Sequence, residues 1–465
     1  MADGSNGAPR GPSERSSGAK RRALANESRL VALGDAVDRQ SGKAPKRRKK
    51  RRRERTWLIA GVAVLVLIVG VLGGGYLYAN WRFDAIPRFN KPIPITYPVP
   101  GQPFNILAVG SDSRAGLTGA VAAQTGAGGG SVVGQRSDVI KIVRVDPTAR
   151  TITVLSIPRD TEVTLLANQA LYGQFNRINV NYANGPALLV RTIKANFGIT
   201  INHVVQVNFN GLINSAVAIG GVYLDFRYPA IDPDSGLEIK HTGCQLVNGA
   251  AALEVARSRH YYYALNGHPV WPNRQEFKNM TDAAINNEIL NDGFVYDGSS
   301  DFGRIDRQTS FLRAMFERVK SKLDNPVAMN GFLSNLPKGI TIDNTFSLNE
   351  LIGLALKFHN YNTNAMQTYT LPEIPATVNG ADVEVVEQPQ AQQLLVNIFG
   401  NTLQRPTNPP PNAESQTPMP PVIAPTTTTT VRTTTTTKHH HAPTTTPTIN
   451  PTLAVPPFDP VPCSP

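Results

Sequence analysis

The stretch RSDVIKIVRVDPTARTITVLSIPRD, residues 136–160, decides how we interpret the fold. Two apolar runs rich in Val and Ile flank the segment DPTAR, residues 146–150, which is typical of a hairpin loop between two antiparallel strands. If Val145 faces Thr151 across the ladder, the polar residues at the two ends of the stretch meet at one end of the hairpin. The pairs are then Arg136 with Asp160, Ser137 with Arg159, and Asp138 with Pro158.

A slip of one residue would move Arg159 to the other face of the hairpin, so proximity is a firmer expectation than direct facing. Taken alone, the pattern is equally typical of surface salt bridges that cover a strand end. The same chemistry recurs along the chain, which favours a binding site. Charged groups end the segments NILAVGSDSR (105–114), EVARSRH (254–260) and DFGRIDRQ (301–308).

Strand-like and helix-like segments alternate between residues 104 and 400, which predicts an α/β/α sandwich with a mixed central sheet. Apolar residues of the segment from Arg304 to Leu323 recur at helical spacing, and Arg304, Arg307 and Gln308 share a neighbouring face. We expect these three side chains to grip one ligand. Expected strands are 104–109, 139–145, 151–157, 203–209 and 222–226, and expected helices are 186–196, 211–218, 249–256, 304–323 and 347–357.

Charge is concentrated at one end of the chain. Residues 1–55 hold 17 Lys/Arg and 6 Asp/Glu, so they carry +11 of the total +12. An uncharged stretch follows, Trp57–Ala79, about 34 Å long as a helix at roughly 1.5 Å per residue, which is enough to cross a bilayer. Positive charge on its N-terminal side predicts a single-pass plasma-membrane protein whose N-terminus is cytoplasmic and whose later residues are extracytoplasmic. No motif for nucleic acid binding accompanies the basic tail.

Composition then divides the chain into five parts. Residues 1–55 are expected to form a disordered basic cytoplasmic tail, 56–80 the transmembrane helix, and 81–103 a Pro-rich spacer. Residues 104–400 are expected to form the extracytoplasmic folded domain, and 401–465 a disordered Pro/Thr-rich tail. The only two cysteines, Cys244 and Cys463, would be free to pair outside the cell, but their sequence context does not decide whether they do.

Several arginines with a few carboxylates, in a domain of nearly neutral charge, suit a pyrophosphate with a divalent metal ion. In their order along the chain and in their residues, the motifs resemble those of the LytR-CpsA-Psr family of cell-wall glycopolymer transferases. The resemblance covers about residues 104–400 and rests on NILAVGSDSR, RSDVIKIVRVDP, LSIPRDT, RINVNYANG, VNFNGLINSAVAIGGV, NGAAALEVARSRH and DFGRIDRQ.

The resemblance implies an enzyme that moves a glycopolymer from a polyprenyl-pyrophosphate carrier onto peptidoglycan and forms a phosphodiester. It implies Mg²⁺, or Mn²⁺, as cofactor, and it implies that a hydrophobic pocket holds the lipid. The Thr/Pro tail and the Ala/Gly/Val content are typical of actinobacteria, where the resemblance would imply arabinogalactan as the polymer.

The resemblance also assigns roles. The metal-associated acids are Asp112 and Asp138. The catalytic residues at the pyrophosphate are Arg136, Arg159, Arg257, Arg259, Arg304 and Gln308, with Asp301 before the last arginine; Arg114 and Arg307 are expected to help bind the substrate. No general base is obvious, and Asp301 is only a candidate.

Two insertions depart from the family pattern. Residues 115–135 are Gly-rich but lack the Lys-Ser/Thr of a phosphate loop, so we expect a flexible loop. Residues 260–300, with Tyr261–Tyr263 and Trp271, are expected to form a surface insertion with its own small helix; a lid or sugar-stacking platform is the alternative.

Three other functions remain open. A polyprenyl-pyrophosphate phosphatase would use water as acceptor, and a lipid or glycan binder would show no turnover. A membrane-bound transcriptional regulator would act through the basic tail, although basic residues beside a membrane more simply attract anionic lipid.

Overall fold

The computed structural model describes residues 73–113 and 137–400, with short gaps at 168, 266–267, 274–276, 278–279, 323–324 and 379, and residues 458–464. Elsewhere it describes 26–34, 36, 62, 64–65, 67, 69–70, 117, 122 and 414–415. Arg114, Arg136 and nearly all of the insertion 115–135 lie outside these residues. The chain divides into two compact units, residues 1–78 and 79–465.

Of the expected transmembrane segment, 56–80, residues 56–61, 63, 66, 68, 71 and 72 lie outside the described residues. Within the part of the chain that the structure describes, no helix is both long and apolar enough to cross a membrane. The described residues of 26–34 and 73–78 in the first unit are helical. The sections below concern the second unit.

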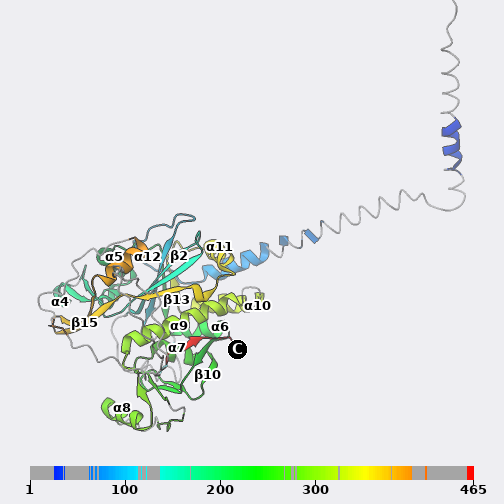
Figure 1. Ribbon diagram of the computed structural model, residues 1–465. Coiled ribbons are helices and arrows are strands. Elements are labelled where there is room, and N and C mark those ends of the chain that lie inside the picture. The colour runs from blue at the N-terminus through cyan, green and yellow to red at the C-terminus, as the bar shows by residue number, and fades with distance from the viewer. Residues whose placement is uncertain are drawn as a thin grey trace, which may run out of the picture. The chain divides into compact units, whose positions relative to one another are not determined.

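A six-stranded mixed sheet forms the centre of the second unit (Figure 1). Its order is β13-β6-β1-β2-β3-β14; β1 runs parallel to β6 and antiparallel to β2, and β3 runs parallel to β14. The strands are β1 (Phe104–Ser111), β2 (Ser137–Asp146), β3 (Thr151–Ile157), β6 (His203–Asn208), β13 (Ile340–Ile342) and β14 (Gln367–Thr370). The ends of β1 and β6, the end of β3 and the start of β2 therefore meet at one edge of the sheet.

The hairpin of β2 and β3 forms as expected, but its register differs by one residue. Val145 pairs with Ile152 and Asp146 with Thr151. The loop is one residue shorter than expected because Asp146 joins the ladder, and its side chain accepts hydrogen bonds from the N–H groups of Thr148 and Ala149, both at 2.8 Å. Continued to the strand ends, this register places Asp138 opposite Arg159.

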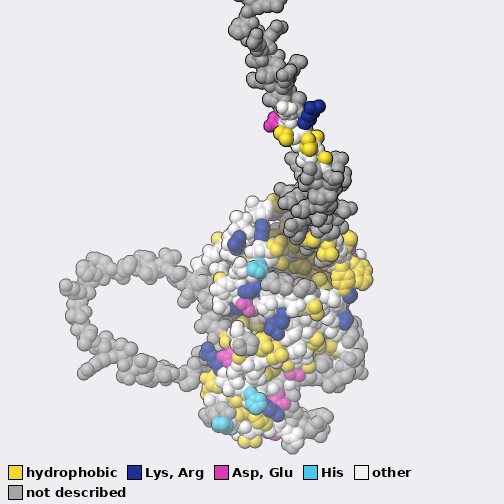
Figure 2. Space-filling view, turned by 90° about the vertical axis from the view of Figure 1, so that its right-hand side faces the viewer, with side chains coloured by type: hydrophobic (Ala, Val, Ile, Leu, Met, Phe, Trp, Pro, Cys, Tyr) yellow, Lys and Arg dark blue, Asp and Glu magenta, His cyan; other side chains and the backbone are white. Residues whose placement is uncertain are grey.

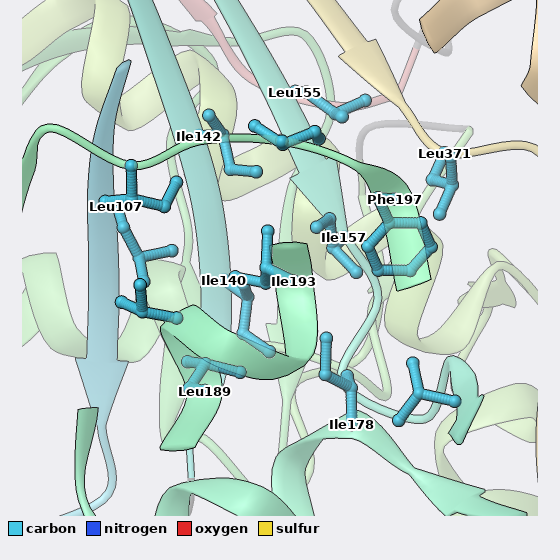
Figure 3. Close-up of a cluster of buried hydrophobic side chains, with 14 of the residues drawn as sticks. Leu107, Ile140, Ile142, Leu155, Ile157, Ile178, Leu189, Ile193, Phe197 and Leu371 are labelled. Carbon is cyan, nitrogen blue, oxygen red and sulfur yellow. The ribbon is translucent and has the colours of Figure 1, made fainter. Parts of the chain in front are cut away.

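Helices cover both faces of the sheet, because apolar side chains alternate along each strand. Leu107, Ile140 and Leu155 pack with α5 (Pro186–Phe197) and α12 (Gln390–Phe399) on one face, where Ile193 and Phe197 close the core (Figure 3). Phe104, Val145, Ile152 and Val154 face the other way, toward Leu312 and Phe316 of α9 (Ser300–Lys320) and Phe358 of α11 (Leu348–Phe358). The mixed α/β/α architecture is as predicted.

A second layer of short elements packs beside α9. It contains α6 (Phe209–Ala218), α7 (Ala250–Arg257), α10 (Pro326–Asn335) and two small sheets, in the orders β10-β7-β18 and β12-β11-β8-β9. The strands are β7 (Val222–Phe226), β8 (Ala230–Asp232), β9 (Leu237–Ile239), β10 (Gly243–Val247), β11 (Tyr262–Tyr263), β12 (Val295–Tyr296) and β18 (Val461–Pro462).

The remaining elements complete the face opposite α9 and the periphery. They are β4 (Glu162–Thr164), α4 (Gln169–Tyr172), β5 (Phe175–Arg177), η1 (Ile178–Asn184), α8 (Asp282–Asn291), η3 (Leu336–Lys338), η4 (Thr363–Ala365), β15 (Glu373–Val378), β16 (Ala381–Val386) and β17 (Glu414–Ser415).

Residues 81–103 do not form a free spacer. Phe83 and Ile86 are buried against Ile342 and Phe346, and Ile95 packs on the core beside α5. The prolines of this segment alternate with apolar residues, which is why the segment follows the surface of the domain.

The expectation of a disordered tail is wrong for residues 458–464. The strand β18 pairs antiparallel with β7, and a disulfide joins Cys463 to Cys244. Phe458 stacks on Tyr263, with ring centroids 4.6 Å apart. These apolar and cysteine residues follow the Pro/Thr low-complexity run, and they have a complementary site on the domain.

The insertion after residue 260 carries its own helix, α8, as expected. Tyr261, Tyr262 and Tyr263 are buried, with at most 5% of each exposed, so they form core rather than a sugar-stacking surface. Trp271 packs edge-on against Phe294.

On the face of the protein drawn in Figure 2, basic and acidic side chains of the described residues are dispersed among neutral ones.

Candidate functional site

A cavity of about 500 Å³ opens where the ends of β1, β2 and β6 meet α6, α7 and α9. Its interior is mostly apolar, and most of its charged groups lie at or near strand and helix ends. The apolar lining comprises Val139, Val207, Phe209, Leu212, Leu253, Phe311, Leu312, Met315, Phe332 and Ile340. Among the predicted site residues, Asp112, Asp138, Arg159, Arg257, Arg259, Arg304 and Gln308 line it.

The β2–β3 hairpin supplies the first charged pair. The guanidinium of Arg159, just beyond β3, donates from Nη1 to Oδ1 of Asp138 at the start of β2, at 2.8 Å. Burial alone would lower the pKa of Arg159, but Asp301, Asp160 and Asp138 outweigh that effect and raise it. The two ends of the stretch 136–160 thus meet at one place.

Asp301 lies behind the lining and connects three arginines from distant parts of the chain. Its Oδ2 accepts from Arg159 Nε at 3.0 Å and from Arg304 Nη2 at 3.1 Å, and its Oδ1 forms an ion pair with Arg259 Nε at 2.5 Å. Burial would raise the pKa of Asp301, but the guanidiniums of Arg304, Arg159 and Arg259 hold it below its ordinary value. An ionised carboxylate therefore gathers these arginines.

Helix α9 positions its pocket residues through its first turns. Arg304 is 5% exposed, and its Nη2 also donates to the backbone oxygen of Asp138 at 3.2 Å. One turn later, Gln308 Nε2 donates to the backbone oxygen of Ala256 in α7 at 2.8 Å. The guanidinium of Arg257, at the end of α7, lies 5.4 Å from the ring centre of Phe209.

The expectation that Arg307 binds the substrate is wrong. Its side chain is completely buried, and Nη1 donates to Asp297 at 2.9 Å and to Asp459 at 2.6 Å. Its Nη2 donates to the backbone oxygen of Ser258 at 3.2 Å. On the helix, position 307 points into the second layer while 304 and 308 point into the cavity, so Arg307 holds structure together behind the site.

Two carboxylates of the cavity have the oxygen donors that Mg²⁺ prefers. Asp112 follows β1, Asp138 begins the neighbouring strand β2, and both line the cavity. Mg²⁺ is commonly held by one or two carboxylates together with waters and substrate phosphates. No group of three or more Asp, Glu, His or Cys side chains that could hold a metal occurs among the described residues, so this pair would need phosphate oxygens to complete the coordination.

Lys141 also lines the cavity, although it is not among the predicted site residues. It is 5% exposed, and its Nζ donates to Ser156 Oγ at 2.7 Å and to Thr309 Oγ1 at 2.9 Å. Burial lowers its pKa to about 7, opposed by Asp306 and reinforced by Arg304. A lysine inside the apolar run VIKIV was the available signal, since a charged residue at an inward-facing strand position requires an explanation.

The sequence analysis also missed His260 and Asp234, which face each other on the cavity rim and line it beside Arg259. The signal for His260 was its position next to EVARSR; nothing in the sequence links it to Asp234, which lies in the turn after β8.

An apolar cavity with guanidiniums and carboxylates at its mouth defines an α/β protein suited to an amphiphilic anion, since arginine forks bind phosphate oxygens in pairs. The chain belongs to the LytR_cpsA_psr family, whose sequence model matches residues 88–264 and 295–399.

Curated relatives agree with this placement. The probable cell wall biosynthesis protein LcpB of Corynebacterium glutamicum is 35% identical over 196 residues, 41% of this chain and 45% of that protein. The polyisoprenyl-teichoic acid–peptidoglycan teichoic acid transferase TagV of Bacillus subtilis is 29% identical over 280 residues, 58% of each chain. The matches thus span about half the length of each relative.

Among solved structures, a LytR-Csp2A-Psr enzyme from Actinomyces oris aligns with a TM-score of 0.47 at 21% identity. The alignment covers 67% of this chain and 95% of that one.

Proposed function

We propose that this protein transfers a glycopolymer from a polyprenyl-pyrophosphate carrier to peptidoglycan and forms a phosphodiester link. The observation that carries the proposal is the convergence of Arg159, Arg259 and Arg304 on Asp301 at the mouth of an apolar cavity. The name of the relative TagV, a teichoic acid transferase acting on a polyisoprenyl-linked polymer and peptidoglycan, supports the same reaction class.

Each part of the site suits one part of such a carrier. The cavity, walled by residues such as Phe311, Leu312 and Met315, takes the first isoprene units of the lipid. The guanidiniums of Arg159, Arg257 and Arg304 hold the pyrophosphate, because bidentate arginine contacts fix the orientation of phosphate oxygens.

The carboxylates Asp112 and Asp138 would hold Mg²⁺, which, when bound, neutralises phosphate charge and favours attack at phosphorus. The chain's own arginines also neutralise phosphate charge, from fixed positions. Phosphoryl transfer depends mainly on positioning and on electrostatic stabilisation of this kind. Asp301 keeps Arg159, Arg259 and Arg304 in place. Its lowered pKa makes its carboxylate a weak base.

The remaining parts of the proposal concern location and substrate. We propose a single-pass plasma-membrane protein, with residues 56–80 as the anchor and the domain outside the cell, where carrier and peptidoglycan meet. Arabinogalactan is the proposed polymer.

One assay tests the reaction. The full chain in detergent is incubated with Mg²⁺, a lipid-pyrophosphate oligosaccharide and peptidoglycan, and both polymer transfer and free phosphorylated oligosaccharide are scored. Transfer that stops with chelator and returns with Mg²⁺ supports the proposal. Hydrolysis without transfer identifies a phosphatase instead, and carrier binding without turnover identifies a binding protein.

A further inference from the structure

His260 and Asp234 form an ion pair on the rim of the cavity, through His260 Nδ1 and Asp234 Oδ2. Their side chains are 43% and 65% exposed, so the pair reaches solvent. The proposed roles of the arginines and carboxylates do not involve this pair.

A buried carboxylate fixes the backbone that carries the pair. Asp232, at the end of β8, is completely buried and ties the turn after β8 to the segment after α7. This arrangement also fixes Arg259, a member of the arginine cluster. Oδ2 of Asp232 accepts from Ser258 Oγ at 2.7 Å, Arg259 N at 2.8 Å and His260 N at 3.0 Å, and Oδ1 accepts from Asp234 N and Ser235 N at 2.9 Å.

The hydrogen bond to Asp234 selects the tautomer of His260. With the proton on Nδ1 directed to the carboxylate, Nε2 carries the lone pair. Nε2 makes no hydrogen bond to any residue that the structure describes. A histidine oriented through one nitrogen by a carboxylate, with the other nitrogen available, is the arrangement that activates hydroxyl nucleophiles.

We propose that His260, oriented by Asp234, is the general base that takes the proton from the acceptor hydroxyl of peptidoglycan. This inference rests on the proposed function and adds the proton acceptor that the arginine cluster lacks. Asp232 is a positioning residue, because it touches only the chain.

The step balances as follows. The hydroxyl proton passes to Nε2 of His260 while the hydroxyl oxygen forms a bond to the phosphorus next to the glycan. The bond from that phosphorus to the bridging oxygen breaks, and polyprenyl phosphate leaves with the electron pair. The proton on the imidazolium then passes to solvent or to the departing phosphate.

The charges around His260 suit a base that works near neutral pH. The hydrogen bond to Asp234 raises the pKa of His260, burial opposes it, and the charge of Asp232 adds to the increase while Arg259 reduces it. Tyr296 of β12 faces the imidazole with ring centroids 6.4 Å apart. The transfer rate should therefore rise with pH as His260 loses its proton and then level off.

The test compares three variants of the full chain with wild type in the transfer assay. His260→Ala should lower kcat at neutral pH at least about 100-fold, within the range for loss of a general base, with little change in KM for the carrier. Added imidazole should restore part of the lost rate. Asp234→Asn should shift the rise of kcat with pH to lower pH. His241→Ala, at an exposed histidine outside the cavity lining, is the matched control.

Carrier affinity and thermal unfolding midpoint, measured on each variant, separate a chemical effect from misfolding. Wild-type transfer with a slow, imidazole-rescued His260→Ala that still binds carrier supports the inference. The inference is overturned, and the proposed function stays intact, if wild type transfers and one of three results is found. These are a His260→Ala variant as fast as wild type, an Asp234→Asn variant with an unchanged pH profile, or a His260→Ala deficit that imidazole does not rescue. Absence of transfer by wild type overturns both.

Discussion

Lys141 gives the prediction whose size follows most directly from the structure. Replacing it by methionine keeps an unbranched side chain of similar length on the cavity floor and removes the buried amine. We expect Lys141→Met to be more stable than wild type at pH 6.5, because the folded protein no longer has to hold a charge away from water.

The expected size comes from the pKa. A decrease from the ordinary 10.5 to about 7, at about 1.4 kcal/mol for each tenfold change in proton affinity, disfavours the charged folded state by about 5 kcal/mol at most. Loss of the hydrogen bonds to Ser156 and Thr309 costs about 1 kcal/mol each. The net gain at pH 6.5 should therefore be about 2 to 3 kcal/mol.

The sign of the pH dependence is fixed as well. Between about pH 7 and 10.5 the unfolded chain keeps a proton on Lys141 that the folded chain has released, so wild-type stability rises with pH over this window. The stability gain of Lys141→Met over wild type should be fully present below about pH 7. It should shrink, then vanish, as the pH approaches 10.5.

Urea denaturation of both proteins at pH 6.5 and 9.5 measures these differences. Lys194→Met, at an exposed position of α5, is the control and should show little change at either pH. An advantage of equal size at both pH values would refute the reasoning, as would a Lys141→Met variant that is less stable at pH 6.5.

Three further predictions concern the rest of the chain. Arg159→Ala and Arg304→Ala should each lower the transfer rate at least about 100-fold, measured with the carrier and peptidoglycan, since each removes a fixed positive group from the phosphates; near-normal rates would contradict their assignment. Deletion of residues 1–45 should leave transfer unchanged in the same assay, whereas a regulator would lose function in cells. Asp459→Ala should destabilise the domain by about 1 to 3 kcal/mol, because Arg307 loses one of its two buried carboxylate partners and keeps only Asp297; an unchanged thermal midpoint would speak against that role.

Local patterns predicted most of the central elements. The Val/Ile runs of β1, β2 and β3 and the apolar stripe of α9 gave these elements within a few residues of their observed bounds. Seven predicted site residues line one cavity. They could be predicted because the ends of strands and helices were recognisable in the sequence.

Properties that depend on distant contacts were not predictable. The hairpin register depends on whether Asp146 enters the ladder or the loop, which apolar alternation alone leaves open. Arg307 and Gln308 are adjacent in sequence, yet Asp297 and Asp459 draw Arg307 into the second layer. The Asp234–His260 pair joins residues from separate elements, and only the folded position of Asp232 brings them together.

The pairing of Cys463 with Cys244 has a topological consequence. Residues 401–457 lie in sequence between Gly400 and Phe458, and the disulfide closes a covalent ring of chain from Cys244 to Cys463 that includes this stretch. A protease that cut once within it would leave one particle on a non-reducing gel and two fragments after reduction.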